Sequence, residues 1–201
     1  MTRAESVELF LDTASKNLSL LATKGGKYSR IDLGDPKKAL ERTNLGIDIV
    51  LSSLSSSLSD VSAFYCLLGP GSNTGIRLGL TIAKTVKGID STVSLYGIGT
   101  LELMLLKDGE KKAVLSDRNG DLYLAQEKDG KIEESKVKKE AVSSLEGPFL
   151  VEKEDLVAQK TLEGKEIVPV DLLSLMLERK KDFRDFSKTP KEYKPHYAFD
   201  L

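Results

Sequence analysis

Residues 61–80 read VSAFYCLLGPGSNTGIRLGL, an apolar run that passes through a glycine-rich turn into a second apolar stretch. Residues 63–68 have the composition of a buried strand, and residues 75–87, apolar almost all round, predict a helix. The turn between them, residues 69–74, could offer backbone N–H groups to a phosphate. It lacks the lysine of a P-loop, however, so glycines that allow a tight turn and close packing are the favoured interpretation. A strand that turns directly into a helix is typical of α/β proteins.

The sequence on either side extends this unit. Short apolar runs at residues 7–11, 18–23 and 28–33 predict a three-stranded meander. Pro36 then marks the start of a helix, and the serine-rich residues 51–59 are interpreted as its polar flank rather than as a linker. The apolar positions of this helix follow helical spacing: Leu40, Ile47, Val50, Leu51, Leu54 and Leu58. Residues 92–96 predict the next strand.

The chain as a whole has a globular composition. Its 201 residues are 40% hydrophobic and 30% charged, with 30 Lys and Arg against 31 Asp and Glu and a formal net charge of −1. A sizeable hydrophobic core is therefore expected. Because the net charge is close to zero, no overall electrostatic attraction to nucleic acid or to an anionic membrane is expected. The single cysteine, Cys66, lies in an apolar run and predicts a small core side chain, which suits a reducing cytoplasm. Because no run of about 18 apolar residues occurs, we expect neither export nor a membrane span.

The distribution of charge divides the chain near Lys107. Residues 43–106 contain 7 charged side chains, whereas residues 107–165 contain 26. We therefore expect an N-terminal lobe of residues 1–106 and a smaller, well-solvated lobe of residues 107–201. The strands expected in the second lobe are residues 113–116, 121–126, 132–137 and 149–152, followed by a helix from 170 to about 183.

A weak internal repeat supports two lobes. The motifs LFLD at 9–12 and KGGK at 24–27 recur in order as VLSD at 114–117 and KDGK at 128–131. The repeat predicts a duplicated fold whose hairpins, bearing Asp12 and Asp117, face one cleft, with the second copy reduced. In a protein that cleaves nucleotides, such acids could hold magnesium or orient water. Capping of their own hairpins is the favoured interpretation.

The reactive groups of common hydrolases and metalloenzymes are largely missing. His196 is the single histidine, which excludes a His-x-x-x-His metal pair, and Ser72 has Pro70 and Thr74 where a nucleophile elbow has glycines. We therefore predict no catalytic residue and no metal site in this chain, and we interpret His196 as a surface residue.

Two further features leave alternatives open. Gly75, Gly79 and Ala83 form a stripe of small side chains on the second predicted helix, which either packs inside the lobe or contacts a partner. Residues 178–194 carry seven basic and four acidic side chains. This segment is either a solvated helix end or a weak contact for RNA or a partner.

Several of these motifs resemble the TsaB (YeaZ) family. The segments that carry the resemblance are LFLDTA at 9–14, GPGSNTGIRLGL at 69–80, Ala83-Lys84, DRNGDLY at 117–123 and PHY at 195–197. It is strong from about residue 7 to residue 98 and thin thereafter. The resemblance implies an α/β fold of two actin-like, ribonuclease-H-like (ASKHA) lobes, with the second lobe reduced.

The resemblance also implies a function. It suggests a non-catalytic scaffold or activator subunit of the complex that makes threonylcarbamoyladenosine in tRNA, paired through its N-lobe helices with the catalytic TsaD. TsaE would be a further partner, and the isolated chain could pair with a second copy of itself. ATP and metal are expected on the partner subunits, with no cofactor on this chain alone. Contact with tRNA is expected through the complex. The chain departs from the family at Thr43-Asn44-Leu45 and Asn73, where relatives often carry His-Ser-Glu and Phe, so pairing could differ.

Two groups of residues follow from this reading. The predicted pairing surface comprises Leu45, Ile49, Thr74, Gly75, Ile76, Arg77, Gly79, Leu80 and Ala83. A nucleotide or phosphate cleft would involve Asp12, Thr13, Gly69, Gly71, Ser72 and Asp117. The alternatives are an actin-like ATPase or phosphotransferase and a divergent homologue whose interaction role has drifted; a protease is disfavoured by the lack of a triad and of a metal pair.

Overall fold

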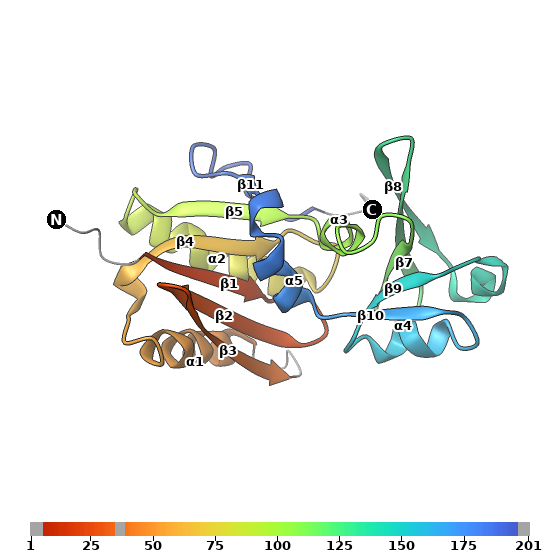
Figure 1. The fold of residues 1–201 in the computed structure, drawn as a ribbon, viewed down its shortest axis with the longest axis horizontal. Helices are drawn as coiled ribbons and strands as arrows, with labels where there is room; N and C mark the ends of the chain where they lie inside the picture. Colours follow the sequence, from red (N-terminus) through yellow and green to blue (C-terminus); the bar gives the residue numbers. More distant parts are fainter. Residues whose placement is uncertain (1–5, 35–38, 197–201) are drawn as a thin grey trace.

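In the computed structural model, which describes residues 6–34 and 39–196, the chain forms two β-sheets that lie side by side as two lobes (Figure 1). Pro36, the predicted helix start, and Tyr197 of the C-terminal motif lie outside the described residues. Within the part that is described, no helix combines the length and the hydrophobicity needed to cross a membrane.

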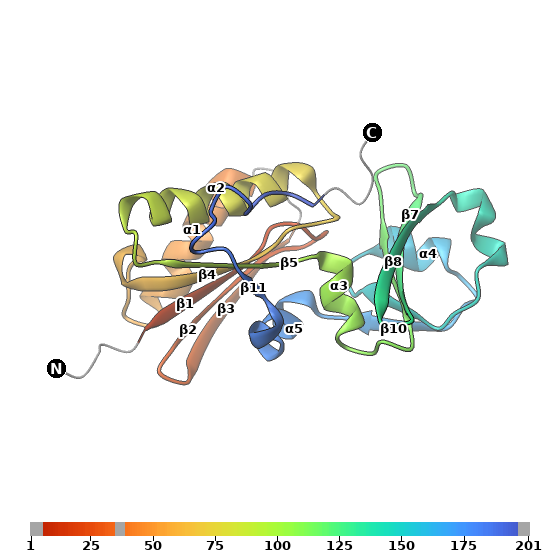
Figure 2. The ribbon, with the colours of Figure 1, turned by 90° about the horizontal axis from the view of Figure 1, so that it is seen from above.

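The first sheet contains the predicted meander. Its strands are β1 (Val7–Asp12), β2 (Leu18–Lys24), β3 (Lys27–Gly34), β4 (Val61–Leu67), β5 (Ser94–Ile98) and β11 (Arg184–Asp185), in the order β11-β5-β4-β1-β2-β3. Strand β1 is antiparallel to β2 and parallel to β4, which is parallel to β5. Helices α1 (Ala39–Ser52) and α2 (Asn73–Ile89) cover one face, and α5 (Leu172–Glu178) packs on the other (Figure 2).

The second sheet repeats this arrangement on a smaller scale. Its strands are β6 (Lys112–Ser116), β7 (Leu122–Lys128), β8 (Lys131–Val137), β9 (Phe149–Glu152) and β10 (Ile167–Val170), in the order β10-β9-β6-β7-β8. Its helices are α3 (Thr100–Leu105) and α4 (Leu156–Thr161), with a 3-10 turn at Lys139–Ser144. Two further 3-10 turns, Leu58–Asp60 and Lys180–Asp182, precede strands β4 and β11 of the first sheet. The predicted duplication is confirmed, since β6 is antiparallel to β7 and parallel to β9, as β1 is to β2 and β4. The second copy is reduced, because the six-residue α4 stands where the first lobe has the 17-residue α2.

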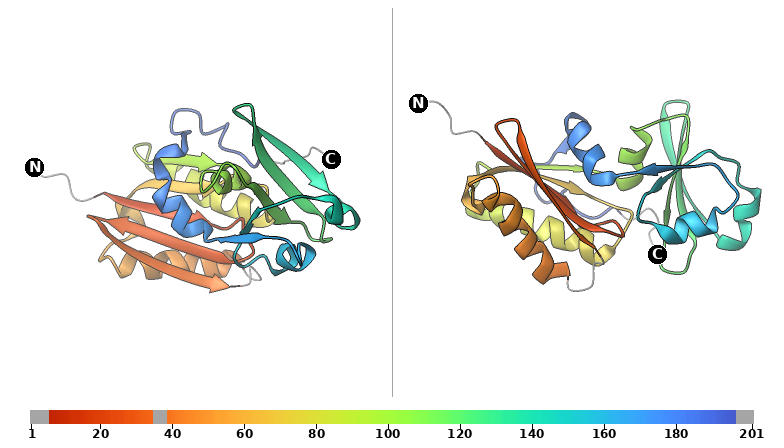
Figure 3. Two further views of the ribbon diagram at one scale, coloured as in Figure 1. Left: turned by 45° about the vertical axis from the view of Figure 1, so that its right-hand side comes forward. Right: turned by 60° about the horizontal axis from the view of Figure 1, so that its bottom comes forward.

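The chain crosses between the lobes twice. It leaves the first sheet through β5 and α3 to enter β6, and it returns from β10 through α5 (Figure 3). Residues 107–201 were expected to form the second lobe, but β11 pairs with β5 and the buried Tyr193 donates its hydroxyl to the Tyr96 carbonyl at 2.9 Å. The C-terminal segment belongs to the first lobe because its aromatic side chains complete the core beside β5.

Helix α1 ends earlier than the spacing of its leucines predicts. It stops at Ser52, and Ser55 adopts a left-handed conformation with φ of 50°. The Ser56 N–H donates to the Leu51 carbonyl at 3.0 Å and the Ser55 N–H to the Ser52 carbonyl at 2.9 Å, which is a Schellman motif. The interpretation of residues 51–59 as a continuation of the helix is therefore wrong.

Candidate functional site: the cleft between the lobes

A cleft of about 880 Å³ lies between the two hairpins that the repeat predicts to face one another. The first lobe contributes residues 14–17 of the β1–β2 turn and residues 71–74 at the start of α2. The second lobe contributes residues 115–119 of the β6–β7 turn, together with Tyr123, Glu152 and Glu154. The structure thus confirms that both hairpin turns line one cleft.

The glycine-rich turn is held against the first hairpin. Ser72 caps α2, since its Oγ accepts the Gly75 N–H at 3.2 Å, and its own N–H donates to the Ala14 carbonyl at 2.7 Å. A Cβ atom at Gly71 would overlap the Ala14 carbonyl oxygen. Gly71 and Ser72 lie at the cleft as predicted, and their contacts serve a tight turn and close packing.

Asp12 lies behind the cleft rather than on its wall. Its buried carboxylate accepts the Ser15 N–H at 3.1 Å and the Ser15 hydroxyl at 2.7 Å, so it caps its own hairpin turn. Burial raises the pKa of Asp12 to about 6, although the bonds from Ser15 oppose the shift. The favoured interpretation of this acid as a cap agrees with its contacts.

Asp117, its counterpart in the second lobe, does line the cleft. It accepts the backbone N–H groups of Asn119 at 2.7 Å and Asp121 at 3.0 Å, and it pairs with Lys136 at 2.6 Å. Burial alone would raise the pKa of Asp117, but the bond from the Lys136 ammonium and those from the turn lower it. This acid also caps its own hairpin.

Glu152, at the end of β9, joins the two lobes and was not singled out in the sequence. Its carboxylate accepts the Lys16 N–H at 3.0 Å and 3.3 Å from its two oxygens, while Lys16 Nζ donates to the Ser116 carbonyl at 3.0 Å. Burial, followed by the nearby Asp12 and Asp155 carboxylates, raises the pKa of Glu152 to about 8. An acid that ends an apolar strand was the one signal in the sequence that could have identified it.

Asp155 supports this junction from the second lobe. Its buried carboxylate accepts the Ser116 N–H at 2.7 Å and the Ser116 hydroxyl at 2.6 Å, and it caps α4 through the Ala158 N–H at 3.0 Å. These bonds hold the start of the β6–β7 turn in place, so that the Ser116 carbonyl can accept the hydrogen bond from Lys16 Nζ.

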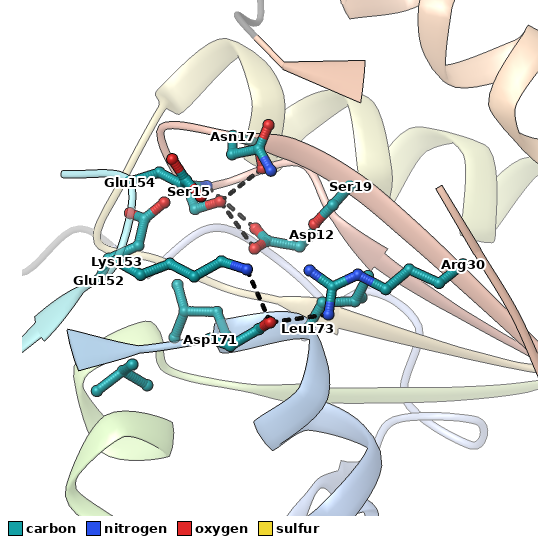
Figure 4. A pocket seen from close by; sticks show the side chains of 12 residues that line it. Asp12, Ser15, Asn17, Ser19, Arg30, Glu152, Lys153, Glu154, Asp171 and Leu173 are labelled. Carbon is teal, nitrogen blue, oxygen red and sulfur yellow. Dashed lines mark hydrogen bonds and ion pairs between the residues drawn. The ribbon is translucent and has the colours of Figure 1, made fainter. Parts of the chain in front are cut away.

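A small cavity of about 10 Å³ lies beside Asp12 and Glu152 (Figure 4). On its other side, Asp171 accepts Arg30 Nη1 at 2.8 Å and Lys153 Nζ at 2.9 Å and caps α5. Burial opposes ionisation of Asp171, but the bonds from Lys153 and Arg30 lower its pKa to about 2. This ion triad ties β3 of the first lobe to the end of β10.

Two other residues predicted for the cleft face elsewhere. Thr13 is buried against α2, where a Cβ at Gly75 would overlap its carbonyl oxygen. Gly69 lies against the His196 backbone, with 2.6 Å between a Cβ built at Gly69 and the His196 carbonyl oxygen. Thr13 and Gly69 therefore do not line the cleft, because the packing of the first lobe covers both.

The predicted pairing surface is only partly exposed. Its buried members are Gly75, Ile76, Gly79, Leu80 and Ala83. They pack inside the first lobe, so their prediction as contact residues is wrong. Leu45 and Ile49 of α1, and Thr74 and Arg77 of α2, are exposed.

The side-chain chemistry needed for a metal centre does not gather in this cleft. Within residues 6–34 and 39–196, no three His, Cys, Asp or Glu side chains are grouped closely enough to hold a metal ion. His196 is exposed and lies 3.2 Å from Glu134 on β8.

Comparison with known proteins identifies the family. Residues 37–182 match the family described as "TsaD: tRNA N6-adenosine threonylcarbamoyltransferase". The chain belongs to this family. The tRNA threonylcarbamoyladenosine biosynthesis protein TsaB of Escherichia coli K12 is 27% identical over 124 residues, which are 59% of this chain and 53% of that protein. The uncharacterized protein MG208 of Mycoplasma genitalium is 27% identical over 101 residues, 49% of this chain and 52% of that protein.

Solved structures of YeaZ proteins share the fold. A Pseudomonas aeruginosa protein described as similar to peptidase YEAZ matches with a TM-score of 0.71 at 16% identity, over 96% of this chain and 100% of the other. YeaZ from the same organism matches with a TM-score of 0.68 at 16% identity, over 96% of this chain and 99% of the other. The α/β, actin-like and ribonuclease-H-like two-lobe fold is thereby confirmed. The chain spans about half the length of the curated relatives that it matches.

Proposed function

We propose that this chain is a non-catalytic scaffold or activator subunit in the biosynthesis of threonylcarbamoyladenosine in tRNA, and that it pairs with the catalytic TsaD. The E. coli relative is named as a biosynthesis protein of this modification, and the matching family is that of the transferase. TsaE as a further partner, ATP and metal on the partner subunits, and contact with tRNA through the complex belong to the same proposal.

The observation that carries the proposal is the outward face of α1. Leu45 is 59% exposed and Ile49 is 41% exposed, four residues apart on the side of α1 that faces away from its buried residues. Large apolar side chains grouped on one exposed helix face are typical of protein–protein contacts. Thr74 and Arg77 are exposed on α2, a helix that covers the same face of the sheet as α1 (Figure 2).

The cleft supports a role other than catalysis in this chain. The carboxylates of Asp12, Asp117, Glu152 and Asp155 accept hydrogen bonds from the chain's own turns and side chains. A carboxylate that caps a turn stabilises the fold, which accounts for these acids without a catalytic role.

The test is co-purification of the chain with TsaD from the same organism. The double variant Leu45→Asp with Ile49→Asp should keep its circular dichroism spectrum and lose TsaD, because two charges would have to be desolvated in the complex. Leu156→Asp, a change at an apolar side chain that is 70% exposed on α4, is the matched control and should retain TsaD. Retention of TsaD by the folded double variant would place the pairing surface elsewhere.

The main alternative, an actin-like ATPase or phosphotransferase, is favoured by one observation, the cleft of about 880 Å³ between the two hairpin turns. We expect the pure chain to show no ATP turnover that follows it through purification. Turnover that follows the protein and disappears in Asp12→Ala would establish this alternative instead.

A further inference from the structure

Glu152 and Lys16 meet where the two lobes touch at the floor of the cleft. The Lys16 N–H, in the β1–β2 turn of the first lobe, donates to both Glu152 oxygens, at 3.0 Å and 3.3 Å. The Lys16 side chain reaches the Ser116 carbonyl of the second lobe at 3.0 Å. Glu152 is 3% exposed and Asp12 is 2% exposed, so both carboxyl groups are shielded from water in this arrangement of the lobes.

The two carboxyl groups border the same small cavity. Figure 4 shows the side chains of Asp12 and Glu152 on either side of Ser15, whose hydroxyl donates to Asp12 at 2.7 Å. The cations of this region are engaged elsewhere, since Arg30 and Lys153 both pair with Asp171, and Lys16 Nζ donates to Ser116. Two further acids lie at this junction. Asp155 is bound by Ser116 and by the start of α4, and Glu154, which also borders the small cavity, is exposed.

We propose that Asp12 and Glu152 form a pH-sensitive latch between the lobes, which holds the cleft closed while one of the two carboxyl groups is protonated and releases it when both are ionised. This interlobe latch consists of Asp12, Glu152 and the Lys16 N–H. It goes beyond the proposed function, because it concerns how far apart the two lobes of this chain stand and not its pairing with a partner.

The physical basis is the cost of two buried negative charges near one another. Two ionised carboxylates in a dry site repel strongly, and each has lost its hydration, so one of them retains a proton. Opening of the lobes hydrates both groups and returns them to ordinary acidity.

The sign of the effect follows from linkage. In the closed form the pKa of Glu152 is raised to about 8 and that of Asp12 to about 6, so the closed form binds more protons than the open form. Closure is therefore most favoured at a pH below the ordinary pKa range of carboxyl groups. It becomes less favoured as the pH rises through the raised pKa values of Asp12 and Glu152. The two segments that connect the lobes, through α3 and through α5, keep them attached when the latch opens.

The experiment measures the distance between the lobes in the full chain. Spin labels are placed at Thr81→Cys in α2 and Asn119→Cys in the β6–β7 turn, both exposed positions, while the native Cys66 is buried. Double electron–electron resonance should give a shorter, narrower distance distribution at pH about 6 than at pH about 9. Circular dichroism at both pH values confirms that the chain stays folded.

Three variants separate the latch from other titrating groups. Glu152→Gln keeps an acceptor for the Lys16 N–H and removes the titration, so its distance distribution should stay short at both pH values. Asp12→Asn should likewise weaken the pH dependence, and it provides a second test if Glu152→Gln does not fold. Glu154→Gln, an exposed carboxylate on the same cleft wall, should leave the pH dependence unchanged.

A pH-independent distance distribution in the unsubstituted chain, or a full pH dependence in both Glu152→Gln and Asp12→Asn, would overturn the latch. Neither outcome bears on pairing with TsaD, because the measurement uses the chain alone.

Discussion

Thr13 explains at the scale of single residues why α2 carries glycines on its inner face. A Cβ at Gly75 would overlap the Thr13 carbonyl oxygen, and a Cβ at Gly79 would lie 2.6 Å from the Thr13 hydroxyl. The first hairpin and α2 can approach this closely only without side chains between them. The stripe of small residues thus packs inside the lobe, and a large side chain such as arginine at Gly79 would disrupt the fold.

Gly75→Ala should lower the free energy of unfolding by about 2–4 kcal/mol, because the new methyl group must displace a backbone oxygen. Gly88→Ala, near the end of the same helix, is the matched control. No atom lies within 4 Å of its added Cβ, so it should raise the free energy of unfolding by about 0.5 kcal/mol. Urea denaturation of the three proteins measures both effects. Equal stability of Gly75→Ala and the unsubstituted chain would show that α2 does not pack on Thr13 as described.

At the scale of elements, the end of α1 shows a backbone motif overriding side-chain spacing. Leu51, Leu54 and Leu58 keep helical spacing, yet the helix stops at Ser52 and Ser55 takes a left-handed conformation. Lys24 of β2 donates to the Leu54 and Ser55 carbonyls at 3.4 Å and 3.3 Å, so the neighbouring strand satisfies groups that a longer helix would bond internally.

Ser55→Gly should raise the free energy of unfolding by about 1 kcal/mol, because glycine adopts positive φ without the cost that a Cβ imposes. Ser53→Gly, two residues earlier, should give no such gain, since Ser53 is not among the described residues with positive φ. Thermal melts followed by circular dichroism would compare the two. A gain at Ser53 that equals the gain at Ser55 would argue against the left-handed turn.

At the scale of the whole molecule, the C-terminal segment ties the end of the chain to its beginning. Tyr193 is fully buried, next to Gly97 and Leu68. Phe183 packs edge-on against Tyr65, which stacks on Phe10 of β1 with 4.5 Å between ring centroids. The stability of the first lobe therefore depends on residues from both ends of the chain.

Tyr193→Ala should lower the free energy of unfolding by about 3–5 kcal/mol, as expected for removal of a large buried aromatic side chain. Tyr193→Phe removes the hydroxyl that donates to the Tyr96 carbonyl and keeps the buried ring, so it should cost about 1 kcal/mol. Lys191→Ala, at an exposed neighbour, is the control and should change little. Guanidinium titrations measure the series. A small loss for Tyr193→Ala would mean that the C-terminal segment is not part of the core of the first lobe.

The sequence by itself determined the features that depend on neighbours along the chain. The two meanders, the strand that turns into α2, and the capping of their own turns by Asp12 and Asp117 arise from alternation, glycine placement and hydrogen bonds over two to four residues. The repeated order of these local signals was enough to predict two lobes and a shared cleft. Leu45 and Ile49 were predicted from the sequence as pairing residues; both are exposed, and the pairing itself stays a prediction.

Only the tertiary structure decided which surfaces meet. Lys16 and Glu152 are 136 residues apart, and Tyr193 bonds to a residue 97 positions earlier, so no local pattern could pair them. A stripe of small side chains fits a strand turn as well as a partner helix, and apolar side chains in a tail can complete the core of either lobe. Hydrophobic burial has no preferred direction, and the partner of each apolar face is therefore settled only when the whole chain has packed.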